Sequence, residues 1–120
     1  MKLEEASIRS GVHAETLKGW RRKGYLGPVP ANGTGNPADY TEVAVSKART
    51  LRSASVLGLP IALLAKRLPD DLHSYSPGSF FIGVRAREDE VDCALFRADE
   101  VDVCDGTAVA FIPLQRAYPR

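Results

Sequence analysis

The sequence predicts an α+β protein in which a mainly helical N-terminal part is followed by a small antiparallel β-meander. Up to residue 68, apolar residues recur at helical spacing, and turn residues such as glycine or proline separate the runs. Beyond residue 78, short β-branched and aromatic runs alternate with acidic turns. Residues 1–68 carry eleven Lys or Arg and five Asp or Glu, a net +6, whereas residues 69–120 carry five and ten, a net −5. This split suggests a cationic surface that meets phosphate, joined to an acidic part that avoids it.

The first predicted helix spans residues 3–10 and is followed by a sharp turn. Gly11 stands where this helix stops, because glycine readily adopts the left-handed conformation that ends a helix. Val12 and His13 lead into the next helix. We interpret His13 as a polar cap or turn residue, with a contact to a DNA base as the alternative.

The second predicted helix covers residues 14–23 and ends at Gly24. Leu17 and Trp20 lie three residues apart, so one face of this helix is apolar. Gly19 lies inside the helix, where glycine costs about 1 kcal/mol of helix propensity relative to alanine. We therefore expect a packing or contact reason for Gly19.

A loop and a third helix come next. Residues 27–39 (GPVPANGTGNPAD) predict a wing or a flexible loop, because Asn32-Gly33 tolerates the positive φ of a tight hairpin. Thr41 can cap a helix that runs from Glu42 towards Gly58. Three cations on this helix should extend the positive surface and either contact phosphate or remain solvated: Lys47, Arg49 and Arg52.

Two prolines frame the fourth predicted helix, which covers residues 61–68. Pro60 suits its first turn and Pro69 closes it. Residues 70–78 (DDLHSYSPG) are polar and turn-rich, so we interpret them as a linker between a first domain, residues 1–69, and a C-terminal region.

The C-terminal region, residues 79–120, should form three or four strands. The predicted strands are Ser79–Arg87, Val91–Phe96, Val101–Cys104 and Thr107–Leu114. So small a sheet must pack on the helices or on a second copy. We therefore expect it either to complete the core or to mediate assembly. The apolar residues available for either role are Phe80, Phe81, Ile82, Val84, Val109, Phe111 and Ile112.

Four stretches of the helical part match the pattern of a known DNA-binding module. Residues 3–12 (LEEASIRSGV) and 15–26 (ETLKGWRRKGYL) resemble the opening helices of MerR-type regulators. Residues 39–43 (DYTEV) resemble that family's wing-to-helix junction, and residues 57–61 (LGLPI) resemble the start of its second helix pair. The resemblance covers about the first 68 residues. It implies a winged helix-turn-helix that binds double-stranded DNA.

By this resemblance, the second helix enters the major groove. Thr16 and Lys18 would face base edges, while the basic run 21–23 would neutralise phosphates. Trp20 would pack along the DNA backbone or in the protein core. The predicted DNA-binding residues are Thr16, Lys18, Trp20, Arg21, Arg22, Lys23, Asn32, Gly33, Asn36 and Tyr40.

The sequence also departs from this family. Ala38 stands where the family usually has an arginine, so the predicted wing residues would replace that contact through amides and backbone donors. The family continues into a long dimerising helix, whereas Pro69 stops the helix here. For the basic run 21–23, the alternative is a solvated helix end that complements the helix dipole.

The two cysteines are too few for a disulfide scaffold and lack metal-binding spacing. We expect Cys93 and Cys104 to be reduced thiols packed as small core residues. A redox-sensitive bridge is the alternative, if Ala98-Asp99 forms a hairpin loop that places the two cysteines opposite each other.

Several function classes are excluded by what the sequence lacks. No Ser/His/Asp, Cys/His, phosphate-loop or zinc-protease pattern is present, so we predict no enzyme and no cofactor. The acidic clusters are interpreted as solvated turns, so we predict no metal and no small-molecule ligand. No apolar run could span a bilayer or act as a signal peptide, so we expect a cytoplasmic protein without a membrane partner.

The predicted function is sequence-specific binding of double-stranded DNA by a small bacterial or phage transcriptional regulator. We expect a homodimer or higher homo-oligomer, since one helix offers few base contacts. Residues 16–20 (TLKGW) also resemble the recognition helix of phage excisionases and small terminase subunits, so an architectural DNA-binding protein is one alternative. A protein-interaction module without DNA binding is the other.

Overall fold

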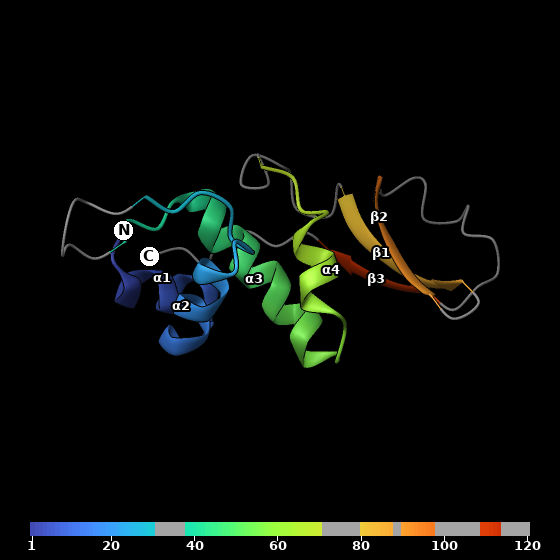
Figure 1. Cartoon of the computed structure of the whole chain (residues 1–120), viewed down its shortest axis with the longest axis horizontal. Coiled ribbons are helices and arrows are strands. Elements are labelled where there is room, and N and C mark those ends of the chain that lie inside the picture. Colours follow the sequence, from blue (N-terminus) through green and yellow to red (C-terminus); the bar gives the residue numbers. More distant parts are fainter. Residues whose placement is uncertain (31–37, 71–79, 88–89, 98–108, 114–120) are drawn as a thin grey trace.

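Helices occupy the N-terminal part of the chain and strands the C-terminal part. The computed structural model describes residues 1–30, 38–70, 80–87, 90–97 and 109–113. The helices are α1 (Leu3–Ser10), α2 (Ala14–Arg22), α3 (Glu42–Val56) and α4 (Ile61–Ala65). The strands are β1 (Phe80–Arg87), β2 (Glu90–Arg97) and β3 (Val109–Pro113). Figure 1 shows α1 and α2 towards one end, α3 in the middle and the sheet at the other end.

One glycine and two serines form the turn between α1 and α2. Gly11 has a φ of 73°, and its N–H donates to the Ser7 carbonyl oxygen at 2.9 Å. The Ser7 hydroxyl donates to the carbonyl oxygen of Val12 at 2.6 Å, and the Val12 N–H donates to Ser10 Oγ at 3.2 Å. The predicted helix-turn-helix is therefore confirmed.

Hydrogen bonds at both ends and a buried leucine hold α2 in place. Nδ1 of His13 accepts a hydrogen bond from the Glu15 N–H at 3.3 Å, so His13 caps the helix. Leu17, in the second turn, is fully buried. Past the last turn, the Tyr25 N–H donates to the Trp20 carbonyl oxygen at 3.0 Å. Hydrogen bonds thus hold both ends of α2, and Leu17 holds one face of it against the core. The opposite face of α2 therefore points away from the core.

α3 supplies most of the helical core. Thr41 caps it, because Oγ1 accepts a hydrogen bond from the Ala44 N–H at 3.1 Å. The buried residues of α3 are Ala44, Val45, Ser46, Lys47, Ala48, Thr50, Leu51 and Ala54. The apolar ones among them pack with Ala6 of α1 and Leu17 of α2 in one cluster: Ala44, Val45, Ala48, Leu51 and Ala54. The small residues let the other helices approach α3 closely.

α4 is shorter than the predicted helix over residues 61–68. It ends at Ala65, and beyond it the Arg67 N–H donates to the Leu64 carbonyl oxygen at 2.9 Å in a tighter turn. Leu64 and Leu68 are both buried, so the apolar spacing that predicted the helix does mark core positions.

The strands do not form the predicted β-meander. Their order is β2-β1-β3, with β1 antiparallel to both neighbours. The prediction of a fold class ending in a β-meander is therefore wrong, since a meander would place β2 in the middle. Because β2 and β3 consequently run parallel to each other, no tight hairpin can join them. The connecting residues 98–108, which include the predicted strand 101–104, lie outside the described residues.

Cys93 links the sheet to the helices. It lies in β2, is 2% exposed, and belongs to the same apolar cluster as the helical core. Its Sγ lies 3.5 Å from the Leu63 carbonyl oxygen of α4. Its partner across the ladder is Val84 of β1. Cys104 lies outside the described residues.

Candidate nucleic-acid interface

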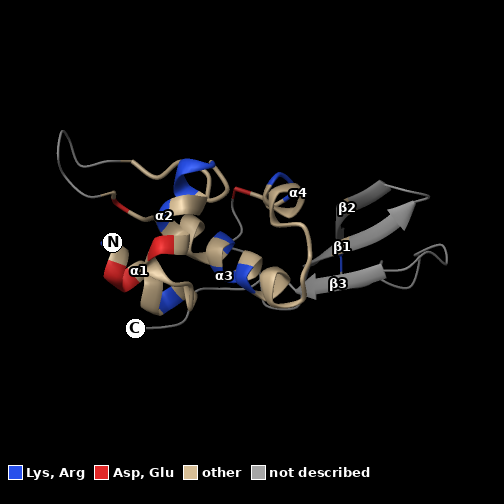
Figure 2. Ribbon diagram, turned by 60° about the horizontal axis from the view of Figure 1, so that its bottom comes forward, with Lys and Arg blue, Asp and Glu red and all other residues tan. Residues whose placement is uncertain are grey.

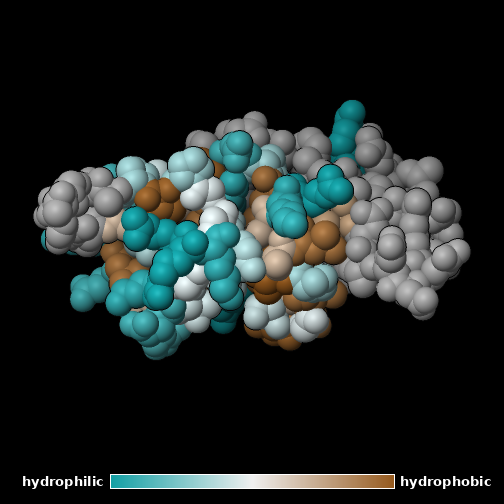
Figure 3. Space-filling view, in the orientation of Figure 1, coloured by the Kyte–Doolittle hydropathy of each residue, from teal (hydrophilic) through white to brown (hydrophobic). Residues whose placement is uncertain are grey.

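One face of α2 points away from the core. Leu17 is fully buried beneath the helix and Trp20 is half-buried against the same cluster. The exposed residues of α2 and its C-cap are Glu15, Thr16, Lys18, Arg22 and Lys23. Figure 2 shows the blue Lys and Arg segments on α2, and Figure 3 shows hydrophilic residues gathered over the α1–α2 end. This face is polar and mostly cationic, so its electrostatic complement is a polyanion.

Two lysines among the predicted contact residues have side-chain partners within the protein. The Lys18 ammonium lies 3.3 Å from a Glu15 carboxylate oxygen, and both side chains are largely solvated. Such an exposed pair is worth less than about 1 kcal/mol, so it leaves Lys18 available to a partner. The Lys23 ammonium lies 5.8 Å from the centre of the Tyr25 ring. Glu15 was missed as part of this face, although its spacing of three residues from Lys18 is the signal for a helical ion pair.

Tyr40 lies behind α2 rather than on the surface. It is 3% exposed, and its burial raises the pKa of the phenol above the ordinary value, whereas the charges of Arg21 and Lys18 lower it. Its backbone pairs with Met1: the Tyr40 N–H donates to the Met1 carbonyl oxygen at 2.8 Å, and the Met1 ammonium donates to the Tyr40 carbonyl oxygen at 2.8 Å. Tyr40 therefore joins the start of the chain to the residues before α3 and belongs to the core, not to the exposed surface.

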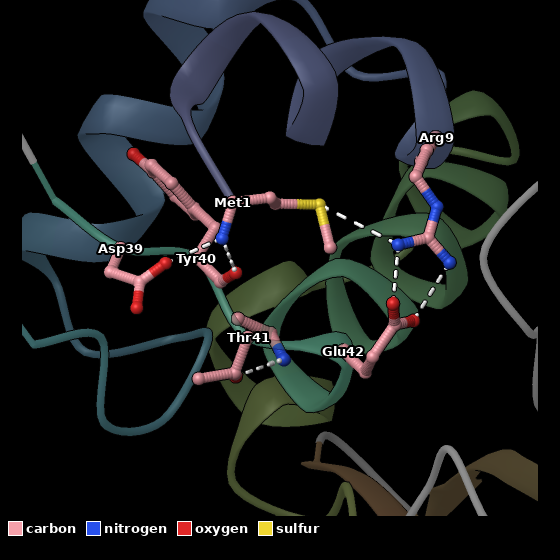
Figure 4. A network of polar contacts seen from close by, with 7 residues as sticks. Met1, Arg9, Asp39, Tyr40, Thr41 and Glu42 are labelled. Carbon is pink, nitrogen blue, oxygen red and sulfur yellow. Dashed lines mark hydrogen bonds and ion pairs between the residues drawn. The ribbon is translucent and has the colours of Figure 1, made fainter. Parts of the chain in front are cut away.

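Polar contacts join both ends of α1 to the start of α3 and the residues before it, as Figure 4 shows. The Met1 ammonium pairs with the Asp39 carboxylate. Arg9 binds Glu42 through both guanidinium nitrogens, with Nη2 2.8 Å from Oε2. The hydrogen bond to Glu42 is the main cause that raises the pKa of Arg9. These contacts fix α1, and with it α2, against the first turn of α3.

The base of the predicted wing is closed by one hydrogen bond. The Asp39 N–H donates to the Pro30 carbonyl oxygen at 2.7 Å, which brings the two ends of the intervening segment together. Three predicted contact residues in that segment lie outside the described residues: Asn32, Gly33 and Asn36.

The predicted extension of the cationic surface onto α3 is wrong for Lys47. Its side chain is only 5% exposed, and its ammonium lies 2.9 Å from the Asp70 carboxylate. The same ammonium would lie 3.0 Å from a Cβ added to Gly27. Lys47 therefore closes the space between α3, the loop after α2 and the end of the helical part. Arg52 is exposed and Arg49 is half-buried.

Among the described residues, no group of three or more His, Cys, Asp or Glu side chains is placed to hold a metal ion. None of the described helices combines the length and apolar character that a membrane span requires.

Comparison with known proteins identifies the module. The family model for MerR HTH family regulatory proteins matches residues 1–71, which include α1, α2, α3 and α4. No curated protein matches the chain. The matched segment is more than half of the 120 residues, and proteins of this family are DNA-binding regulators rather than enzymes. The chain therefore belongs to the MerR HTH family of regulatory proteins.

Proposed function

We propose that the chain is a transcriptional regulator that recognises a specific duplex DNA sequence by placing α2 in the major groove. Thr16 and Lys18 face base edges, and Arg22 and Lys23 neutralise phosphates on either side. Half-buried Arg21 contributes charge from the flank of the helix. Trp20 and Tyr40 act from within the protein, by holding α2 at its angle to the rest of the domain.

The outward face of α2 is the observation that carries this proposal. An α-helix with its side chains is about 10–12 Å across, which fits a major groove about 12 Å wide. Leu17 anchors the helix to the core, so the side chains opposite it are presented together. Those side chains combine a hydroxyl, which reads base edges, with cations, which bind phosphate.

The regulator acts as a homodimer on two half-sites about one helical turn apart, or a multiple of that. One α2 reaches only a few base pairs, so a second copy supplies the rest of the specificity. Two chains per bound duplex, measured by analytical ultracentrifugation, are the expected stoichiometry.

Selection of bound duplexes from a random library tests the recognition role. Lys18→Ala is expected to relax the selected sequence, because it removes a donor to base edges. Arg22→Ala is expected to weaken all sequences alike and to lower the slope of log affinity against log salt by about 1. Lys2→Ala removes one equal charge at an exposed position outside α2 and serves as the control.

Three outcomes would contradict parts of this proposal. If Arg22→Ala loses specificity and Lys18→Ala weakens all sequences alike, then Arg22 contacts the bases and Lys18 the phosphates. Strong bending and tandem cooperative sites would indicate an architectural protein instead of a regulator. If the wild-type chain is not retained on duplex DNA at about 50 mM salt, where phosphate contacts are strongest, DNA binding itself is ruled out.

A further inference from the structure

Gly19 is the one described glycine among residues 1–70 whose backbone conformation does not call for glycine. The others all have positive φ, between 72° and 77°, and they are Gly11, Gly24, Gly27 and Gly58. Gly19 instead lies inside α2 with helical geometry. Alanine at an interior helix position is favoured over glycine by about 1 kcal/mol, so the conformation of α2 argues against glycine here.

Packing within the protein does not call for glycine at this position either. A Cβ built on Gly19 meets no atom within 4 Å among the described residues, apart from its chain neighbours and the helix's own backbone. Gly27 differs, because a Cβ there meets the Lys47 ammonium at 3.0 Å. The space above Gly19 is therefore open in the described structure, and neither backbone conformation nor internal packing accounts for the missing side chain.

Gly19 lies at the centre of the outward face of α2. Successive helical residues are rotated by about 100°, so Gly19 points almost opposite to buried Leu17. Exposed Thr16 precedes it by three residues and Arg22 follows it by three, so both are its neighbours on the helix surface. The missing side chain leaves a shallow notch between a hydroxyl and a cation.

We propose that Gly19 is the point where the backbone of α2 comes closest to duplex DNA, and that its notch admits the edges of the bases. This inference rests on the proposed function. A hydrogen bond weakens steeply beyond about 3.2 Å, so a methyl group that lifts the helix by about 1 Å would break contacts made on both sides of it. Gly19 thus determines how deeply α2 is seated, and through that depth it determines specificity.

Gly19→Ala tests the proposal because stability and DNA binding should change in opposite directions. The unfolding midpoint should rise by about 3–6 °C, as expected for improved helix propensity in a domain of this size. Affinity for the selected duplex should fall about tenfold or more, corresponding to the loss of one good base contact. Affinity for random duplex should change less, because the phosphate-binding cations are retained.

Two further variants sharpen the test. Gly19→Leu is as good a helix former as alanine within a few tenths of a kcal/mol but is much larger, so it should weaken binding more than Gly19→Ala. Ser55→Ala replaces an exposed residue in the last turn of α3 and should raise the midpoint without changing affinity. Circular dichroism confirms that each variant keeps its helices.

The outcomes separate this inference from the proposed function. If the wild-type chain binds DNA and Gly19→Ala binds it equally well or more tightly, the role of Gly19 is overturned, while the proposed function is not. Equal losses on selected and random duplexes overturn it as well, because depth in the groove should matter for base contacts. Absence of wild-type binding at low salt overturns the proposed function and this inference together.

Discussion

The buried phenol of Tyr40 lies close enough to α2 to be influenced by the charges on that helix. Its ring is almost fully enclosed, yet its pKa responds to the charges of Arg21 and Lys18 on α2. The backbone of Tyr40 meanwhile pairs with Met1 at the start of the chain. The side chain therefore belongs to the apolar core, and its phenol lies within electrostatic range of two cations on α2.

The raised pKa of Tyr40 predicts a loss of stability at alkaline pH. Below about pH 10 the phenol is neutral in both the folded and unfolded states and contributes no pH dependence. Above that pH the unfolded state releases its proton first, so the free energy of unfolding falls. Thermal unfolding of the wild-type chain and of Tyr40→Phe, followed from pH 8 to about pH 11, should show a shallower decline for the variant. Parallel curves would show that Tyr40 ionises equally easily in both states.

Lys47 is predicted to act in the fold and not at the DNA. Lys47→Met keeps the aliphatic packing and leaves exposed Asp70 hydrated, so the free energy of unfolding should change by less than about 1 kcal/mol or increase. Lys47→Ala removes buried methylenes and should cost about 1–3 kcal/mol. Urea unfolding measures both. A loss of DNA affinity in Lys47→Met as large as that of Arg22→Ala would place Lys47 at the interface after all.

At the scale of elements, α2 carries a carboxylate on a face that otherwise suits phosphate. The carboxylate of Glu15 lies next to the Lys18 ammonium and neutralises part of its charge. Its position in the first turn favours the helix, because a carboxylate complements the positive end of the helix dipole. The residue therefore stabilises α2, while its negative charge makes this face less favourable for a polyanion.

Glu15→Gln should strengthen DNA binding several-fold. The change removes a negative charge from the α2 face and releases Lys18, so affinity should rise about threefold to tenfold at low salt. Glu4→Gln changes the net charge of the chain equally on α1 and should have a smaller effect. Fluorescence anisotropy with the selected duplex compares the two. Weaker binding by Glu15→Gln would instead identify Glu15 as a residue that contacts a base.

The helices could be predicted from the sequence because their signals are local. Thr41 as a cap and Gly11 as a stop act within one turn, and the structure shows both in those roles. The burial of Lys47 could not be predicted, because it depends on Asp70 and Gly27 in other segments. The direction of the α2 face follows from Leu17, but the position of Tyr40 behind it required the tertiary structure.

The order of the strands in the sheet could not be predicted from local sequence signals. A run of β-branched residues indicates that a strand exists, but not which neighbour it pairs with. The expectation of a meander assumed that consecutive strands pair. Here β1 pairs along both of its edges. In the register of the sheet, Ile82 lies opposite Leu95 of β2 on one side and Ile112 of β3 on the other.

At the scale of the whole molecule, the described sheet packs against the helices through Cys93. β2 lies beside α4, and the thiol is enclosed with the helical core. Among the described residues, Cys93 thus joins a strand of the acidic part to the positively charged helical part. The contact gives a direct means of measuring whether the two parts separate.

Cys93 should be protected from thiol reagents in the native protein. In a Cys104→Ser background it is the only thiol, so its labelling reports opening of the contact between β2 and α4. Native labelling is expected to be at least about a hundredfold slower than labelling in denaturant, as for a group reached only through opening of the fold. Labelling of the native chain at the denatured rate would mean that the sheet does not cover Cys93.

The central position of β1 also sets an order of events during synthesis. Residues 1–71 leave the ribosome before the strands and contain α1, α2, α3 and α4, so the helical part can fold before the sheet is synthesised. Only residues 88–89 separate β1 from β2, whereas residues 98–108 separate β2 from β3, so β3 is the last strand to reach β1. Until β3 arrives, one edge of β1 presents unpaired backbone groups to other chains. Aggregation of nascent or truncated chains is therefore expected to begin at this edge, and pairing of β3 with β1 should suppress it.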